Sequence, residues 1–167
     1  RTLSAAGVID LADLPEDMEF TDPQERAKTA VLSGTTVVEP GLAAALDAIV
    51  WPCNYLDFET VTTALPLYPG CGCHEHVLTQ YSIHHRAGPD GDVAHYEYLA
   101  DARRDGQREL TESLIDDLEG PGSIIVYSTY EDQRIKELAE RFPDLNSALQ
   151  SLRDRLVDLL VVVRNFV

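Results

Sequence analysis

The feature that most constrains the fold is a short, uncharged apolar segment between two helical patterns. Residues 123–127 read SIIVY, directly after a Gly-Pro-Gly breaker. A strand of this composition is buried on both faces of its sheet, which is typical of α/β proteins. Apolar side chains recur at helical spacing in residues 107–118 and 130–142, so we expect a helix on either side of this strand.

Three extended segments precede this unit. Residues 54–60, 77–85 and 93–99 are rich in aromatic and β-branched side chains, whereas 65–76 is rich in Pro, Gly and Cys and is expected to be a loop. Short connections between consecutive strands favour an antiparallel meander. After the second helix, Asp144 is expected to cap a last helix with a leucine stripe from Leu145 to Leu159. The order predicts a mixed α/β sheet.

The residues before this sheet have a different pattern. Short helices are expected in the first part of the chain, one over 23–32 after an N-cap at Asp22 and one over 39–50. Pro52 ends the second. We therefore expect an N-terminal helical segment over 1–51 and a mixed-sheet domain over 52–167.

Charge and cysteine content narrow the partners and the compartment. The 167 residues carry 13 Lys and Arg against 29 Asp and Glu, a net charge of −16. Nucleic-acid binding is disfavoured at this charge unless bound divalent cations invert it locally. Long apolar runs and a signal peptide are both missing, so no membrane association is expected. Three cysteines are an odd number, which favours a reducing, cytoplasmic location.

Acidic side chains at strand ends are the main candidates for chemistry. Asp57 and Glu59 stand two residues apart on an expected strand, so both point from one face. Like charges held side by side are unfavourable unless a cation lies between them, although the motif alone favours a solvated face of an edge strand. Glu131 follows the apolar strand at a helix start, where ligands gather in α/β sheets and where acids also suit the helix dipole.

Other polar residues have more ordinary interpretations. Asp158 lies in an apolar stretch and is either a metal ligand or a paired acid in a packed helix. Gln80 is on the strand expected to pair with that of Asp57. Arg134 and Lys136 are expected to be solvated helix charges rather than phosphate clamps. The segment Cys71-Gly-Cys73-His74-Glu-His76 carries zinc-type ligands, but its spacing is unusual and favours a loop over a zinc site.

These acids resemble the motifs of the DEDD superfamily of 3′ to 5′ exonucleases, which have an RNase H-like fold. The first motif of that superfamily, D-x-E on the first strand of a meander, matches Asp57-Phe-Glu59-Thr60, and its second acid after a buried strand matches Glu131. The chain departs from the superfamily in having Ser128 and Glu131 in the second motif. It also ends before a third motif, so the domain is expected to be truncated at its C-terminus and its site incomplete.

The chain also resembles, more narrowly, a bacterial family of uncharacterised proteins that usually follow a RecB-like nuclease domain. The stretches that carry this resemblance extend over nearly the whole chain: 7–15, 55–60, 64–70, 80–82, 97–100, 134–139 and 158–159.

The superfamily resemblance implies a two-metal phosphodiesterase that uses Mg²⁺ or Mn²⁺ on the end of a DNA or RNA strand. Asp57 would bridge both ions, Glu59 and Glu131 would be further ligands, and Thr60 and Gln80 would face the substrate. Asp158 is a possible additional ligand. The alternatives are a noncatalytic RNase H-like module that binds nucleic acid or protein and a zinc-stabilised interaction domain.

Overall fold

The computed structural model describes residues 7–15 and 17–167, so the first six residues of the expected helical segment lie outside the described part. The chain divides into two compact units. One is the sheet unit, residues 48–159, and the other combines the described part of residues 1–47 with residues 160–167. The sheet unit contains every candidate acid named above.

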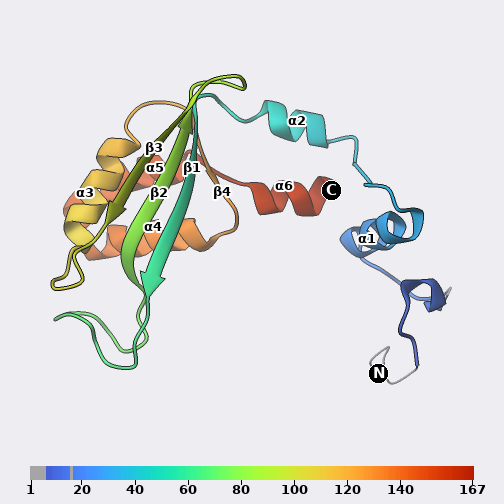
Figure 1. Ribbon diagram of the computed structural model, residues 1–167, viewed down its shortest axis with the longest axis horizontal. Coiled ribbons are helices and arrows are strands. Elements are labelled where there is room, and N and C mark those ends of the chain that lie inside the picture. Colours follow the sequence, from blue (N-terminus) through green and yellow to red (C-terminus); the bar gives the residue numbers. More distant parts are fainter. Residues whose placement is uncertain (1–6, 16) are drawn as a thin grey trace. The chain divides into compact units, whose positions relative to one another are not determined.

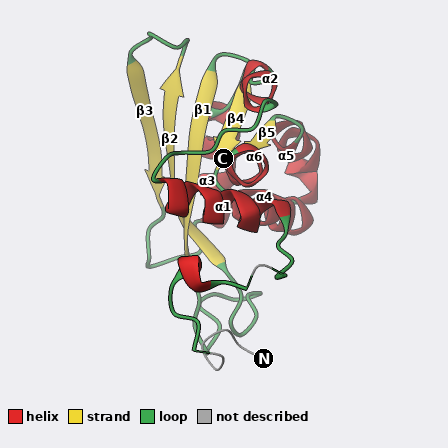
Figure 2. Cartoon of the chain, turned by 90° about the vertical axis from the view of Figure 1, so that its right-hand side faces the viewer, coloured by secondary structure: helices red, strands yellow, loops and turns green. Residues whose placement is uncertain are grey.

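The sheet unit is built on a five-stranded mixed sheet with the order β3-β2-β1-β4-β5. Figure 2 shows this order across the sheet. The strands are β1 (Cys53–Val61), β2 (Val77–Arg86), β3 (Val93–Leu99), β4 (Ser123–Val126) and β5 (Leu156–Asp158). Strands β1, β2 and β3 form the expected antiparallel meander, and β4 and β5 add to it in parallel. The mixed α/β architecture is confirmed.

Alternation of side chains along β1 gives the sheet one buried and one open face. Leu56 and Phe58 are buried, whereas Asp57 and Glu59 between and beside them are exposed. Helices α3 (Gln107–Asp117), α4 (Tyr130–Arg141) and α5 (Asn146–Arg153) lie together behind the sheet in Figure 1. Their apolar side chains form one core with those of the strands. The core therefore holds β1 in place, while its acids remain on the opposite face.

The prediction of one continuous last helix from Asp144 to Leu159 was wrong. The chain instead forms a short 3-10 turn (Pro143–Leu145), α5, strand β5 and then α6 (Leu159–Phe166). The guanidinium of Arg155 donates to the carbonyls of Gly122 and Leu118 at 2.8 Å each, and the chain turns beside the edge of β4. Leu149 and Leu152 from the helix and Leu156 from the strand all reach one core, so the leucine spacing alone could not separate the two elements.

The other unit is made of short helices. Helix α1 (Asp22–Ser33) begins one residue earlier than expected, after Thr21, whose amide donates to Gln24 at 2.9 Å. Thr21, not Asp22, is therefore the N-cap. Helix α2 (Leu42–Asp47) is much shorter than the expected 39–50. Within this unit the Glu39 amide donates to the carbonyl of Phe166 at 2.8 Å.

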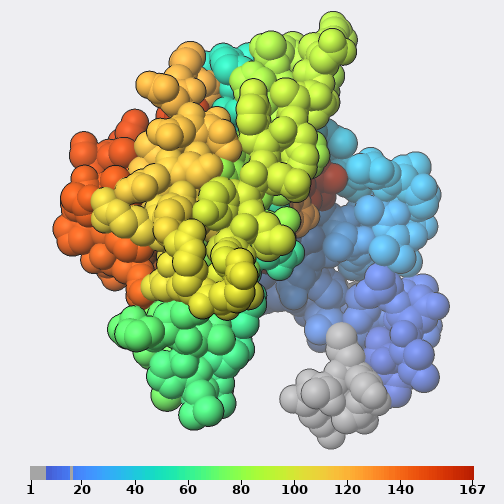
Figure 3. Space-filling model, turned by 60° about the vertical axis from the view of Figure 1, so that its left-hand side comes forward, coloured from blue at the N-terminus to red at the C-terminus, as the bar shows by residue number. Residues whose placement is uncertain are grey.

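The long connection between β1 and β2, residues 62–76, contains no helix or strand, as expected. It is drawn in green in Figure 3, where it projects below the rest of the sheet unit. Its last residues return to the sheet unit at His76, just before β2 begins.

Candidate functional site

Two of the candidate acids lie on the open face of β1. Asp57 pairs in register with Ser82, and Glu59 pairs with Gln80 of β2. Residues in register share a face, so Gln80 is on the same face as both acids, as the sequence predicted. A register shift follows between Glu59 and Thr60. Both acids are exposed and can therefore meet a ligand.

Glu131 lies at the start of α4, directly after the end of β4. The connection turns sharply at Ser128, whose φ of 138° is unusual for a residue with a side chain. The Ser128 hydroxyl accepts a hydrogen bond from the Tyr130 amide at 3.1 Å, which stabilises this turn. The turn directs Glu131 inward, so that it is only 5% exposed. Its Oε2 atom is buried and has no hydrogen-bond partner.

The charges of two other carboxylates, one on β1 and one on β5, act on Glu131. Burial raises the pKa of Glu131, and the negative charges of Asp57 and Asp158 raise it further, whereas a hydrogen bond that the carboxylate accepts from its own backbone amide lowers it. Asp158 ends β5 and pairs in register with Val126 at the end of β4. Asp158 therefore lies at a strand end and not, as one alternative had it, within a packed helix.

The donor set suits a hard divalent cation, although the carboxylates are spread apart. Across residues 7–15 and 17–167, no three His, Cys, Asp or Glu side chains are gathered closely enough to hold a metal ion. Mutual repulsion between carboxylates favours such a spread arrangement without a cation. The buried, unpartnered Oε2 of Glu131 is the feature that fits a cation, because a carboxylate oxygen is the ligand that Mg²⁺ and Mn²⁺ prefer.

Thr60 forms a hydrogen-bonded group with Tyr130, which had no expected role, and with His76, which was considered only as a zinc-type ligand. Its hydroxyl lies 2.6 Å from the Tyr130 hydroxyl and 3.1 Å from Nδ1 of His76. The His76 and Tyr130 rings meet edge to face. This group connects the end of β1, the start of α4 and the end of the 62–76 loop. Thr60 thus follows Glu59 in β1, and its hydroxyl is engaged with protein groups.

The ligands of the alternative zinc segment have separate environments. Cys71 is buried with its Sγ 3.8 Å from Nη2 of Arg141, whereas Cys73 is exposed. His76 is directed at Thr60. The structure thus gives these side chains no common centre.

Arg134 corrects the sequence analysis most clearly. We expected a solvated helix charge, but Arg134 is only 8% exposed. Positions 131, 134, 135 and 138 form a single helical stripe, and Ile135 and Leu138 belong to the core. That spacing indicates burial of Arg134, whereas the charge of its side chain alone predicts exposure.

Among the described residues, no helix combines the length and the apolar composition that crossing a membrane requires. Comparison with curated proteins and with solved structures gave no match. A family model does match residues 54–167. This range includes all five strands except the first residue of β1, and all four candidate acids, called the acid cluster below: Asp57, Glu59, Glu131 and Asp158. The chain therefore belongs to the family described as "Domain of unknown function (DUF2779)".

Proposed function

We propose that the sheet unit is a metal-dependent nuclease domain, a 3′ to 5′ exonuclease that hydrolyses phosphodiester bonds of DNA or RNA. The observation that carries this proposal is the buried, unpartnered carboxylate oxygen of Glu131, which lies within the influence of two other carboxylate charges. An acidic group in this position is costly in the absence of a cation. A cluster kept at such a cost is typical of a functional site.

The topology supports an RNase H-like arrangement. An antiparallel meander is followed by a helix, a parallel strand β4 beside β1, and a second helix that carries Glu131. The acids come from the central strand β1, from the start of α4 and from the end of β5. This is the edge at which α/β sheets place their ligands.

Each acid has a distinct part in the proposed reaction. Asp57, Glu131 and Asp158 would hold Mg²⁺ or Mn²⁺, with Glu59 beside Asp57 on the same face. The bound ions would activate a water and neutralise charge on the phosphate. Asp57 is exposed, so it would bind the cation on the side that faces the substrate phosphate. Glu131 is buried, so it would bind the cation from the protein interior. Thr60 and Gln80 would contact the nucleic acid next to the bound cations. The sequence resemblance adds a RecB-like nuclease domain as a proposed partner.

The test is digestion of end-labelled single-stranded DNA and RNA with Mn²⁺ by the native protein and by Asp57→Asn. We expect the variant to lose activity by orders of magnitude, because it removes a metal ligand. Glu97→Gln is the matched control, since Glu97 is an exposed acid on β3 that pairs with Ser82 and lies one strand further from the acid cluster.

Each result decides between functions. Loss in Asp57→Asn with retention in Glu97→Gln supports the nuclease. Equal digestion by the native protein and Asp57→Asn refutes the mechanism. Absence of digestion by the native protein, together with absence of Mn²⁺ binding, leaves the noncatalytic RNase H-like module as the better account.

A further inference from the structure

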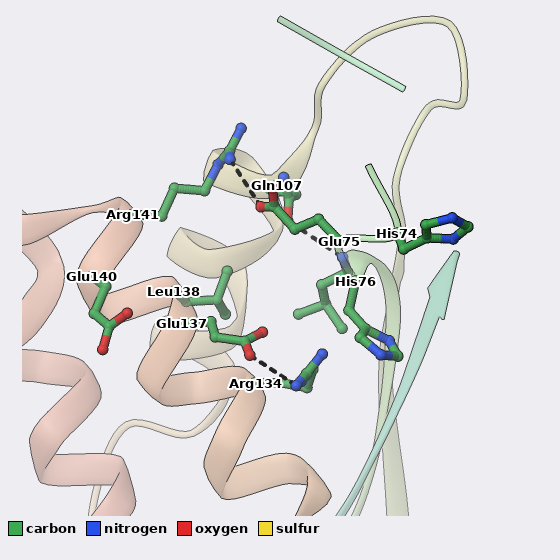
Figure 4. Close-up of a pocket in the computed structure, with 10 residues that line it drawn as sticks. His74, Glu75, His76, Gln107, Arg134, Glu137, Leu138, Glu140 and Arg141 are labelled. Atoms are coloured by element: carbon green, nitrogen blue, oxygen red, sulfur yellow. Dashed lines mark hydrogen bonds and ion pairs between the residues drawn. The ribbon is translucent and has the colours of Figure 1, made fainter. Parts of the chain in front are cut away.

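A pocket of about 550 Å³ lies beside the acid cluster, between α4, the start of α3 and the end of the 62–76 loop. Figure 4 shows Arg134 and His76 together at one end of it and Arg141 at the other. Arg141 is well paired, since it donates to Asp105 at 2.7 Å and approaches Glu75 at 3.6 Å. Arg134 is not, and the inference rests on this difference.

The guanidinium of Arg134 is buried but incompletely satisfied. Its Nε and Nη1 atoms are buried without a hydrogen-bond partner. Only Nη2 has one, the carboxylate of Glu137 at 2.9 Å. The guanidinium also packs over the Tyr130 ring, with its Cζ 5.1 Å from the ring centroid. A cation that is held in one position by an aromatic ring and left with unpaired donors is well prepared to bind an anion.

Glu137 marks where that anion would bind. Its side chain is 40% exposed, whereas that of Arg134 is 9% exposed. An ion pair with one solvated partner is weak, so Glu137 can turn out into water at small cost. An incoming oxyanion would then replace the carboxylate oxygen at Nη2. Glu137 pairs with Arg134 through a single carboxylate oxygen. A phosphate that presents two oxygens can pair with the guanidinium through two parallel hydrogen bonds.

Two parts of the chain link the pocket to the acid cluster. Arg134 is three residues after Glu131 in α4, so their side chains are neighbours on the helix surface. On the other side, His76 contacts Thr60, which directly follows Glu59 in β1. An extended strand with one phosphate at the acids would therefore pass the pocket with another.

We propose that Arg134 binds a backbone phosphate of the nucleic-acid strand, and that Glu137 occupies this position when the strand is absent. This inference rests on the proposed function for the identity of its ligand. Phosphate binding at Arg134 needs no metal, however, and can be measured separately from hydrolysis.

The experiment measures binding of a fluorescent single-stranded thymidine 12-mer by anisotropy across a salt series, in EDTA and again in CaCl₂, because a bound divalent cation offsets the negative charge of the protein. Arg134→Gln is expected to weaken binding about tenfold or more, the effect of losing a charged hydrogen bond. It should also make the slope of log K against log salt shallower by about 0.7. Glu137→Gln should have the opposite effect and tighten binding, because it removes the competing carboxylate.

Matched controls come from the exposed pair Arg108 and Glu112 on α3, whose side chains are each 48% exposed. Arg108→Gln and Glu112→Gln change the net charge by the same amounts, so general charge effects appear in both sets. Near-UV circular dichroism checks the fold of Arg134→Gln. If that variant is unfolded, Glu137→Gln decides alone: tighter binding supports the proposal, and unchanged or weaker binding overturns it.

The two proposals fail in different ways. Binding that depends on Arg134 and Glu137, without hydrolysis in Mn²⁺, supports the phosphate site and refutes the nuclease. Hydrolysis that depends on Asp57, with both pocket variants binding like their controls, refutes the phosphate site and leaves the nuclease standing. A native protein that does not bind the 12-mer refutes the phosphate site.

Discussion

The buried carboxylate of Glu131 lies within the electrostatic influence of Asp57, although the two residues are 74 positions apart in the sequence. They meet because β4 pairs in parallel with β1, and α4 begins directly after β4. The negative charge of Asp57 disfavours ionisation of the Glu131 carboxyl unless a cation lies between the two.

Replacing Glu131 with glutamine should stabilise the metal-free protein. Removal of an unsatisfied buried charge is worth about 1–3 kcal/mol, since the amide keeps the shape of the side chain. The thermal midpoint in EDTA at pH 7.5 should therefore rise by a few degrees. Addition of Mn²⁺ should raise the midpoint of the native protein, by about 2.7 kcal/mol in unfolding free energy at 100 times the dissociation constant, and raise that of Glu131→Gln far less. Equal stabilisation of both by Mn²⁺ would refute a metal role for Glu131.

Asp158 should matter more for metal affinity than Glu59. The charge of Asp158 raises the pKa of the buried Glu131, whereas Glu59 lies two residues beyond Asp57 along β1. We expect Asp158→Asn to weaken Mn²⁺ binding about tenfold or more, and Glu59→Gln to weaken it less. Isothermal titration calorimetry with MnCl₂ measures both. If Glu59→Gln weakened Mn²⁺ binding more than Asp158→Asn, the metal site would lie along β1 and away from β5.

Gly122 should be intolerant of any side chain. Its φ is 96°, and an added Cβ would overlap the carbonyl oxygen of Pro52. Gly120 has a similar φ of 103° but nothing within 4 Å of the added atom. Gly120→Ala should thus cost about 1–2 kcal/mol through backbone strain alone. Gly122→Ala should cost at least about 2 kcal/mol more. Urea unfolding compares them, and equal losses would show that the overlap is readily relieved.

Asp105 should make stability depend on acid. Burial alone would raise the pKa of Asp105, but hydrogen bonds from the Gln107 amide and from Arg141 outweigh it and hold that pKa below its usual 3.8. The folded state therefore favours the ionised form. This stabilisation is complete well above pH 3.8 and is lost as the pH falls through the lower folded value.

Asp105→Asn should accordingly lower the free energy of unfolding by about 1 kcal/mol at pH 6, with the gap to the native protein closing toward pH 2.5. Urea titrations at several pH values measure the gap. Asp92→Asn, at an exposed position before β3, is the control and should show none. A gap that stays constant with pH would contradict the assigned hydrogen bonds.

The sequence by itself determined the elements whose patterns are local. Alternation in 54–60 predicted a strand with Asp57 and Glu59 on one face, and helical spacing predicted α3 and α4 within one residue of their ends. The Gly and Pro breakers located the loops. These features follow from side-chain period and backbone preference, which neighbouring residues decide.

Only the tertiary structure decided what distant segments do to one another. Whether 156–158 is helix or strand depends on an open edge at β4, which no local pattern records. The burial of Arg134 depends on the sheet that covers its helix face. The raised pKa of Glu131 likewise requires Asp57 of β1, the start of α4 and the end of β5 to lie near one another. Long-range pairing and burial produce all three, because each is a property of the packed surfaces rather than of the residues that form them.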